Sequence, residues 1–207
     1  MNKSKTDTNL VVVVLGVSRS GKDTTADYLV EDYGFEVTHM LSDYYEFLEE
    51  HFDLEKGSLR GGSSKQLKMP GSNITYAEFL VKQFHLCEEA GILFTSPFIQ
   101  KVLKNVNKNT VLTGVRNFHE ALPIISLRFG EQEGIGGAAL NLNPNYEVLP
   151  ILIERPGYLG FTSDVNVYKL VKLFEEHGIA VSRVTNDGTI PELYSKIDEV
   201  IMEAYTN

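Results

Sequence analysis

Residues 10–15 read LVVVVL, an apolar and mostly β-branched run in which polar and apolar side chains do not alternate. A strand that exposes one face to water shows such alternation, whereas a strand covered on both faces of a parallel sheet does not. Gly16 follows the run directly, and residues 22–33 then place Ala26 and Leu29 at helical spacing. This stretch therefore predicts a buried central strand, a glycine-containing turn and a helix.

The rest of the chain repeats this alternation of short apolar runs and helical patterns. Further strands are predicted at 35–40, 110–113, 148–153 and 180–184. Helices are predicted at 44–51, 75–90, 164–177 and 191–205, with Phe79, Leu80, Phe84 and Leu86 as the core stripe of the second and Pro191 as the first residue of the last. Alternating strands and helices predict an α/β fold of three layers, in which helices cover both faces of a parallel, doubly wound sheet of five strands.

Two segments do not fit this alternation. Residues 53–74 and 130–147 are rich in Gly, Ser, Asn or Pro, and long irregular segments in compact domains are usually binding loops, lids or insertions. We expect one domain over residues 1–207 that carries both segments.

The turn after the first strand is the strongest functional signal. It reads GVSRSGKDTT, with Gly16, four residues, Gly21 and then Lys22. Glycines let backbone N–H groups wrap an anion, the helix start adds the positive end of its dipole, and the lysine reaches the outer phosphates. The turn therefore predicts a binding site for a nucleoside triphosphate, ATP, made by Gly16, Ser18, Arg19, Ser20, Gly21, Lys22, Asp23, Thr24 and Thr25. Together with the alternating strands and helices, it predicts the three-layer α/β fold of P-loop NTPases.

Composition restricts the partners. The formal net charge of −9 disfavours nucleic-acid binding, because the acidic surface repels phosphates where no basic stripe is present. Cys87 has no second cysteine with which to form a disulfide, and the five histidines show no zinc spacing. The run at 10–15 is too short to span a membrane or to form a signal peptide. We expect a cytoplasmic protein without membrane contact that acts on a small nucleotide; a homodimer is left open.

Beyond these patterns, GVSRSGKDTTADYL resembles the phosphate loop of phage deoxynucleoside monophosphate kinases, in which Asp-Thr also follows the lysine. Adenylate kinases are similar, with Lys-Gly-Thr there. YGFEVTHMLSDYYEFLEE resembles the second strand and following helix of these kinases and of dephospho-CoA-kinase-like proteins. ITYAEFL, TVLTGVRNFHEA and TNDGTIPELYSKI occur in the family's order, so the resemblance covers most of the chain.

The resemblance implies phosphoryl transfer from ATP to a nucleoside monophosphate, most plausibly a deoxynucleotide. It implies that Lys22, Arg116 and Arg155 surround the transferred phosphate. It places the acceptor in an insertion at 43–91, with Asp43 and Arg60 as acceptor residues, although Asp43 also suits the N-cap of the helix at 44–51. It further implies that Asn186, Asp187 and Gly188 lie near the nucleotide base.

One position departs from the family. Thr113 ends the third strand where an aspartate is common, so Asp23 and Thr24 become the local candidates for binding Mg²⁺. This departure keeps two alternatives open: a kinase of another small metabolite such as dephospho-CoA, and a nucleotide-binding module that does not transfer phosphate rapidly.

Overall fold

The computed structural model describes residues 9–61, 64–89, 101, 103, 106, 108–127, 146–158 and 166–206. The chain divides into two compact units. One unit is formed by Met1–Met40 together with Gln100–Asn207, and the other is Leu41–Ile99. The second unit is thus inserted into the first along the chain, between the second and third strands.

The first unit is built on a sheet of five parallel strands in the order β2-β3-β1-β4-β5. The strands are β1 (Asn9–Leu15), β2 (Glu36–His39), β3 (Thr110–Thr113), β4 (Tyr146–Glu154) and β5 (Ser182–Thr185). The predicted α/β fold with five parallel strands is therefore confirmed, and β1 is the central strand as expected.

Burial of β1 explains its unbroken apolar sequence. From Leu10 to Leu15 no residue of the strand is more than 3% exposed. β3 pairs with β1 on one side and β4 on the other, the latter along all of Asn9–Leu15. A strand enclosed in this way has no face for polar side chains.

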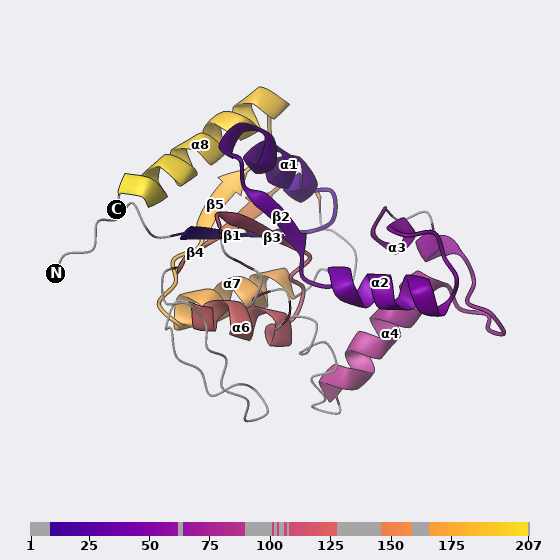
Figure 1. Cartoon of the computed structure of the whole chain (residues 1–207). Coiled ribbons are helices and arrows are strands. Elements are labelled where there is room, and N and C mark those ends of the chain that lie inside the picture. Colours follow the sequence, from indigo (N-terminus) through magenta and orange to yellow (C-terminus); the bar gives the residue numbers. More distant parts are fainter. Residues whose placement is uncertain are drawn as a thin grey trace. The chain divides into compact units, whose positions relative to one another are not determined.

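Four described helices cover the two faces of the sheet (Figure 1). α1 (Lys22–Tyr33) and α8 (Ile190–Thr206) lie on one face, and α6 (Phe118–Leu127) and α7 (Val167–Glu176) lie on the other. This gives the predicted three layers. α6 was not among the predicted helices, because its apolar residues surround a proline, Pro123, that interrupts the helical pattern.

A group of tyrosines joins α1 to α8. The hydroxyls of Tyr28 and Tyr33 both donate to Oδ1 of Asp198, over 2.6 and 2.7 Å. The ring of Tyr28 also stacks on that of Tyr194, with centroids 3.9 Å apart. The hydrogen bond to Asp198, with burial, raises the pKa of Tyr28 to about 12. The two helices on this face are therefore held by polar contacts as well as by the core.

The second unit, Leu41–Ile99, has its own small core. Its described elements are α2 (Ser42–His51), α3 (Ser58–Gly61), the 3₁₀ turn η2 (Ser64–Gln66) and α4 (Tyr76–Glu89). Their buried residues are Leu41, Tyr44, Tyr45, Leu48, Leu59, Tyr76 and Leu80. Buried Glu49 accepts hydrogen bonds from the backbone N–H groups of Gly57 and Leu59, each over 2.7 Å. This carboxylate orders part of the segment 53–74, which was predicted to be irregular throughout.

Several predicted element boundaries and one predicted core residue are wrong. α2 begins at Ser42, so Asp43 lies inside the first turn and Leu41 occupies the N-cap. Leu86, predicted to face the core, is 65% exposed. α8 begins at Ile190, one residue before Pro191. Of the predicted irregular segment 130–147, the last two residues belong to β4 and the others lie outside the described residues.

The contact of Asp198 with Tyr28 and Tyr33 makes a prediction about stability. Asp198→Ala should lower the free energy of unfolding by about 2 kcal/mol, because hydrogen bonds to a charged group contribute more than neutral ones. Urea unfolding at pH 7 measures the change. Glu199→Ala, which truncates an exposed acid on the same helix, should stay within about 0.5 kcal/mol of the wild type. Equal effects of the two substitutions would contradict the role of Asp198.

Candidate functional site

The loop between β1 and α1 leaves the sheet at the carboxyl end of the central strand. Its first residue, Gly16, has a φ of 145°. A Cβ atom at this position would lie 2.5 Å from the carbonyl oxygen of Ile153 and 2.6 Å from Oγ of Ser20. Both distances are too short for any side chain, so this turn requires glycine.

The middle of the loop contains two residues with positive φ. Arg19 has a φ of 63° and Gly21 a φ of 110°, and the N–H of Ser20 closes a turn on the carbonyl of Val17 over 3.2 Å. Left-handed residues between right-handed ones turn successive N–H groups toward one side and form an anion-binding concavity. α1 begins directly after Gly21, so its uncapped first turn adds further N–H groups.

Lys22 crosses this loop. Its Nζ donates to the carbonyl oxygen of Val17 over 2.6 Å. The side chain is thus folded back over the concavity, with its charge at the loop rather than in bulk water. This places the ammonium group at the loop, and the role predicted for Lys22 at the outer phosphates stays a prediction.

Two hydroxyl groups of the loop are buried and lack a hydrogen-bond partner within the described part of the chain. They are Oγ of Ser20 and Oγ1 of Thr25, and both residues have an exposed fraction of 0%. Buried hydroxyls are normally hydrogen-bonded, because an unpaired one loses its bonds to water. These two groups therefore fit a ligand with oxygen atoms.

The predicted magnesium residues, Asp23 and Thr24, lie in the first turn of α1. Asp23 is exposed and Thr24 is half-buried. Over the described ranges, His, Cys, Asp and Glu side chains form no group of three or more that could hold a metal. Carboxylate and hydroxyl oxygens suit Mg²⁺, which in nucleotide sites is bound through few protein ligands and the phosphates. The assignment of Asp23 and Thr24 stays a prediction.

Arg155 is brought to the loop from the end of β4. Its Nη1 donates to the carbonyl oxygen of Arg19 over 3.5 Å, and its Cζ lies 4.9 Å from the ring centroid of Tyr158. The ring supports the guanidinium through a cation–π contact. The structure therefore places this predicted catalytic arginine, exposed to solvent, beside the phosphate loop.

A cavity of about 270 Å³ lies next to Val17 of the loop, at the carboxyl ends of β4 and β5. Its lining is Val17, Leu152, Ile153, Glu154, Arg155, Pro156, Tyr158, Val167, Tyr168 and Thr185. The hydroxyl of Tyr168 donates to Oε1 of Glu154 over 3.1 Å. Open α/β sheets bind ligands at this edge. Sequence reasoning missed the two tyrosines, because neither belongs to a motif.

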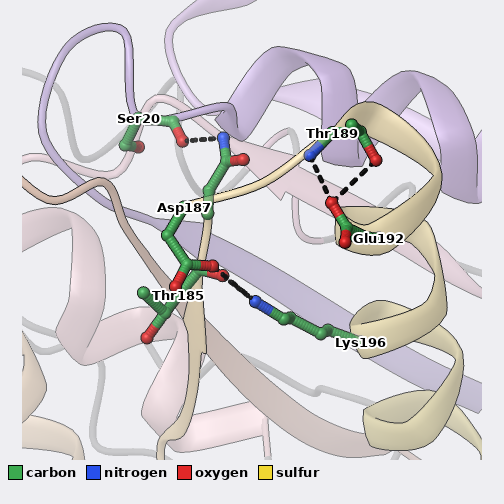
Figure 2. A network of polar contacts seen from close by, with 7 residues as sticks. Ser20, Thr185, Asp187, Thr189, Glu192 and Lys196 are labelled. Atoms are coloured by element: carbon green, nitrogen blue, oxygen red, sulfur yellow. Dashed lines mark hydrogen bonds and ion pairs between the residues drawn. The ribbon is translucent and has the colours of Figure 1, made fainter.

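The segment after β5 contains the three residues predicted near the base. Nδ2 of Asn186 donates to the carbonyl oxygen of Ser20 over 2.8 Å. Asp187 pairs with Nζ of Lys196 over 2.7 Å, and this contact lowers the pKa of Asp187. Figure 2 shows the network, with Ser20 of the phosphate loop near one end and Lys196 of α8 at the other. Asn186 and the loop are therefore in direct contact.

Arg116 lies at the end of β3 and is exposed. Its backbone N–H donates to Oε2 of Glu120 over 2.6 Å. Among the described residues, no recorded contact joins its guanidinium to the phosphate loop. The predicted acceptor residues Asp43 and Arg60 belong to the other unit, Asp43 in α2 and Arg60 in α3, where the side chain of Arg60 is not among those described. The roles of all three residues stay predictions.

Glu120 was not predicted to matter and is 1% exposed. It caps α6: Oε2 accepts the N–H of Asn117 over 3.3 Å, and Oδ1 of Asn117 accepts the N–H of Glu120 over 3.0 Å. Oε1 has no partner among the described residues. Burial raises the pKa of Glu120 to about 7. The sequence NFHE carries the capping-box spacing and was the available signal.

Known proteins similar to this chain were found among solved structures. No protein-family model and no curated protein matches the chain. Among solved structures, a gluconokinase from Sinorhizobium meliloti 1021 is similar at 13% identity and a TM-score of 0.42, over 95% of this chain and 94% of that one. A shikimate kinase from Aquifex aeolicus vf5 shows 14% identity and a TM-score of 0.43, over 95% and 99%.

A thymidylate kinase from Ehrlichia chaffeensis is similar at 16% identity and a TM-score of 0.41, over 94% of this chain and 99% of that one. With such low TM-scores, these likenesses support no conclusion about activity, and the function proposed below rests on the residues of this chain. Along the described part of the chain, no helix combines the length and apolar character needed to cross a membrane.

Gly16→Ala should distort the phosphate loop, because the added Cβ meets the Ile153 carbonyl at 2.5 Å in a backbone conformation that alanine disfavours. We expect the affinity for ATP, measured by calorimetry, to fall at least about tenfold. Gly178→Ala is the matched control, since Gly178 has a φ of 70° but nothing within 4 Å of its Cβ position. Unchanged ATP affinity in Gly16→Ala would contradict this reading of the loop.

Glu120 makes a prediction about pH. Its pKa is about 7 in the folded chain against an ordinary value of 4.5, so the folded state binds the proton more tightly than the unfolded state. The stability it contributes is present below pH 4.5 and is lost as the pH rises to about 7. Between pH 5 and pH 8 the wild type should lose about 2 kcal/mol more unfolding free energy than Glu120→Gln. Unfolding free energies that change with pH in the same way for both proteins, measured by urea unfolding at each pH, would contradict this prediction.

Proposed function

We propose that the chain transfers the γ-phosphoryl group of ATP to a small molecule. The observation that carries this proposal is the loop Gly16–Thr25, in which Lys22 lies over a concavity of N–H groups and Ser20 and Thr25 present unpaired buried hydroxyls. A polyphosphate chain would satisfy all three kinds of group. Phosphoryl transfer needs such positioning and charge neutralisation more than covalent chemistry by the protein.

The residues around the loop have separate roles in this proposal. Lys22 exchanges the Val17 carbonyl for a phosphate oxygen and neutralises its charge. Arg155, held by the Tyr158 ring beside the loop, approaches the transferred group from the end of the neighbouring strand β4. Bound Mg²⁺ would supply further charge neutralisation through oxygens of Asp23, Thr24 or the neighbouring Thr25. Arg116 is the second predicted arginine, and it reaches the transferred group by moving its exposed side chain.

The cavity beside Val17 gives the nucleoside a place to bind. It lies at the edge of the sheet that carries the phosphate loop, and its lining combines apolar residues with Glu154, Arg155 and two tyrosine rings. Nucleotide sites are built in this way, from apolar walls with a few polar groups that fix orientation. We therefore place the base and ribose of ATP there, with Asn186, Asp187 and Gly188 at the rim.

The acceptor is the finer part of the proposal. We propose a nucleoside monophosphate, most plausibly a deoxynucleotide, bound by the unit Leu41–Ile99 through Asp43 and Arg60. Supporting this are the resemblance to deoxynucleoside monophosphate kinases and the insertion of a separate compact unit between β2 and β3. A kinase that acts on dephospho-CoA would use the same donor site and a different acceptor.

A second candidate is a nucleotide-binding module that does not transfer phosphate rapidly. Thr113 supports this reading, because it ends β3 without the carboxylate expected there, and β3 is a direct neighbour of β1. Such a module would bind ATP through the same loop and would release no ADP with any acceptor.

A coupled ADP-release assay over the common nucleoside and deoxynucleoside monophosphates, with dephospho-CoA as a further acceptor, tests the proposal. We expect turnover with one class of acceptor and a loss of at least about a hundredfold in kcat for Lys22→Ala, because this ammonium meets the developing charge. The matched control is Lys172→Ala, which removes an exposed lysine paired with Glu176 on α7 and should leave turnover unchanged. ATP binding without turnover for any acceptor would overturn kinase activity and favour the second candidate.

A further inference from the structure

We propose that Asn186 is a positioning residue that sets the anion-binding conformation of the phosphate loop from outside it, by holding the carbonyl oxygen of Ser20. This goes beyond a contact with the nucleotide base. It rests on the proposed function in one respect, namely that the loop binds a polyphosphate.

The contact with Asn186 fixes the orientation of the peptide group between Ser20 and Gly21. Nδ2 of Asn186 donates to the Ser20 carbonyl over 2.8 Å. None of the described peptide bonds is cis, and in a planar trans peptide the C=O and the following N–H point in opposite directions. Holding the Ser20 carbonyl toward Asn186 therefore turns the N–H of Gly21 away from Asn186. In our proposal that N–H is one of the donors to the phosphate.

Two other loop carbonyls also accept hydrogen bonds from within the protein. The Val17 carbonyl accepts from Lys22 and from the N–H of Ser20, and the Arg19 carbonyl accepts from Arg155. A carbonyl oxygen that faced the bound phosphate would repel it. In the proposed reaction Lys22 turns to the phosphate and Arg155 approaches the transferred group, so both of their contacts with carbonyl oxygens give way. Asn186 is then the side-chain donor of these three that keeps a loop carbonyl turned outward while the loop is occupied.

The lack of a side chain at Gly21 leaves room for the amide of Asn186. A Cβ atom on Gly21 would lie 2.5 Å from Nδ2 of Asn186. The glycine therefore has two reasons to be there, its φ of 110° and the space that the amide occupies. The Asn186 amide therefore fills the space beside Gly21 in this structure.

Asn186 itself is anchored from several directions. Its backbone N–H donates to the carbonyl of Glu154 at the end of β4 over 2.7 Å. Nζ of Lys196 donates to the carbonyl of Thr185 and to Asp187, the residues on either side, each over 2.7 Å. Figure 2 shows Thr185 and Asp187 at the end of β5 and Lys196 on α8. The amide is therefore held on rigid elements, as a positioning group must be.

Helix α8 is fixed at the same end. Both the backbone N–H and the hydroxyl of Thr189 donate to Oε2 of Glu192, over 2.6 and 2.8 Å, in the capping pattern drawn in Figure 2. Lys196, which holds Asn186 through its neighbours, is one turn further along this helix. The loop geometry thus depends on a contact chain from α8 through Asn186 to the Ser20–Gly21 peptide.

Calorimetric binding of sodium tripolyphosphate and of ATP to the full chain tests the inference, because tripolyphosphate has phosphates and no base. Asn186→Ala removes the donor without adding charge, and we expect both affinities to fall by the same factor, about tenfold or more. The control, Asn109→Ala, makes the same truncation before β3 and removes contacts with Leu10 and Tyr205. It should lower the melting temperature but leave both affinities as in the wild type.

Three binding outcomes overturn the inference. If Asn186→Ala weakens ATP but not tripolyphosphate, Asn186 contacts the base; if both affinities persist while the melting temperature falls, its role is structural. A wild type that binds neither ligand overturns the inference as well. The wild type can instead bind tripolyphosphate with an affinity that depends on Asn186 and yet phosphorylate no acceptor. That result leaves the inference standing and contradicts only the proposed kinase activity.

Discussion

The pairing of β4 alongside β1 is the constraint on which the rest of the first unit depends. The two strands run parallel over all of Asn9–Leu15, and this pairing brings the Ile153 carbonyl to within 2.5 Å of where a Gly16 side chain would start. The first residue of the phosphate loop therefore packs directly against the backbone of β4. At the end of β4, the carbonyl of Glu154 accepts from the N–H of Asn186, and the next residue, Arg155, donates to the carbonyl of Arg19. The strand that packs against the loop thus also contacts two residues of the site.

The carbonyl oxygens and the hydroxyl groups of the loop differ in their hydrogen bonding. Side chains from three separate places in the sequence donate to its carbonyl oxygens: Lys22 from α1, Arg155 from the end of β4, and Asn186 from the end of β5. Two hydroxyls, on Ser20 and Thr25, are buried without a partner among the described residues. The carbonyl oxygens of Val17, Arg19 and Ser20 thus have partners within the protein, whereas these two hydroxyls have none in the described part of the chain.

The first unit also shows how polar groups away from the loop are used. Half-buried Asp198 accepts two tyrosine hydroxyls and joins α1 to α8, whereas buried Glu120 caps α6 and leaves one carboxylate oxygen without a partner among the described residues. Burial raises the pKa of Glu120, and the hydrogen bonds from Arg116 and Asn117 and the charge of Arg116 lower it by less. The first arrangement holds α1 against α8, and the second makes stability sensitive to protonation.

The amino-acid sequence by itself determined the elements with strong local signals. Short apolar runs predicted all five strands, and Gly16, Gly21 and Lys22 predicted the phosphate loop, since both signals depend on neighbours in the chain. Local pattern failed where contacts distant in sequence decide the outcome: the order in 53–74 comes from Glu49, and Leu86 is exposed although it fits a helical stripe. Only the tertiary structure brought Asn186, Arg155 and the cavity to the loop, because parallel strands with long crossovers place residues more than a hundred positions apart at one edge of the sheet.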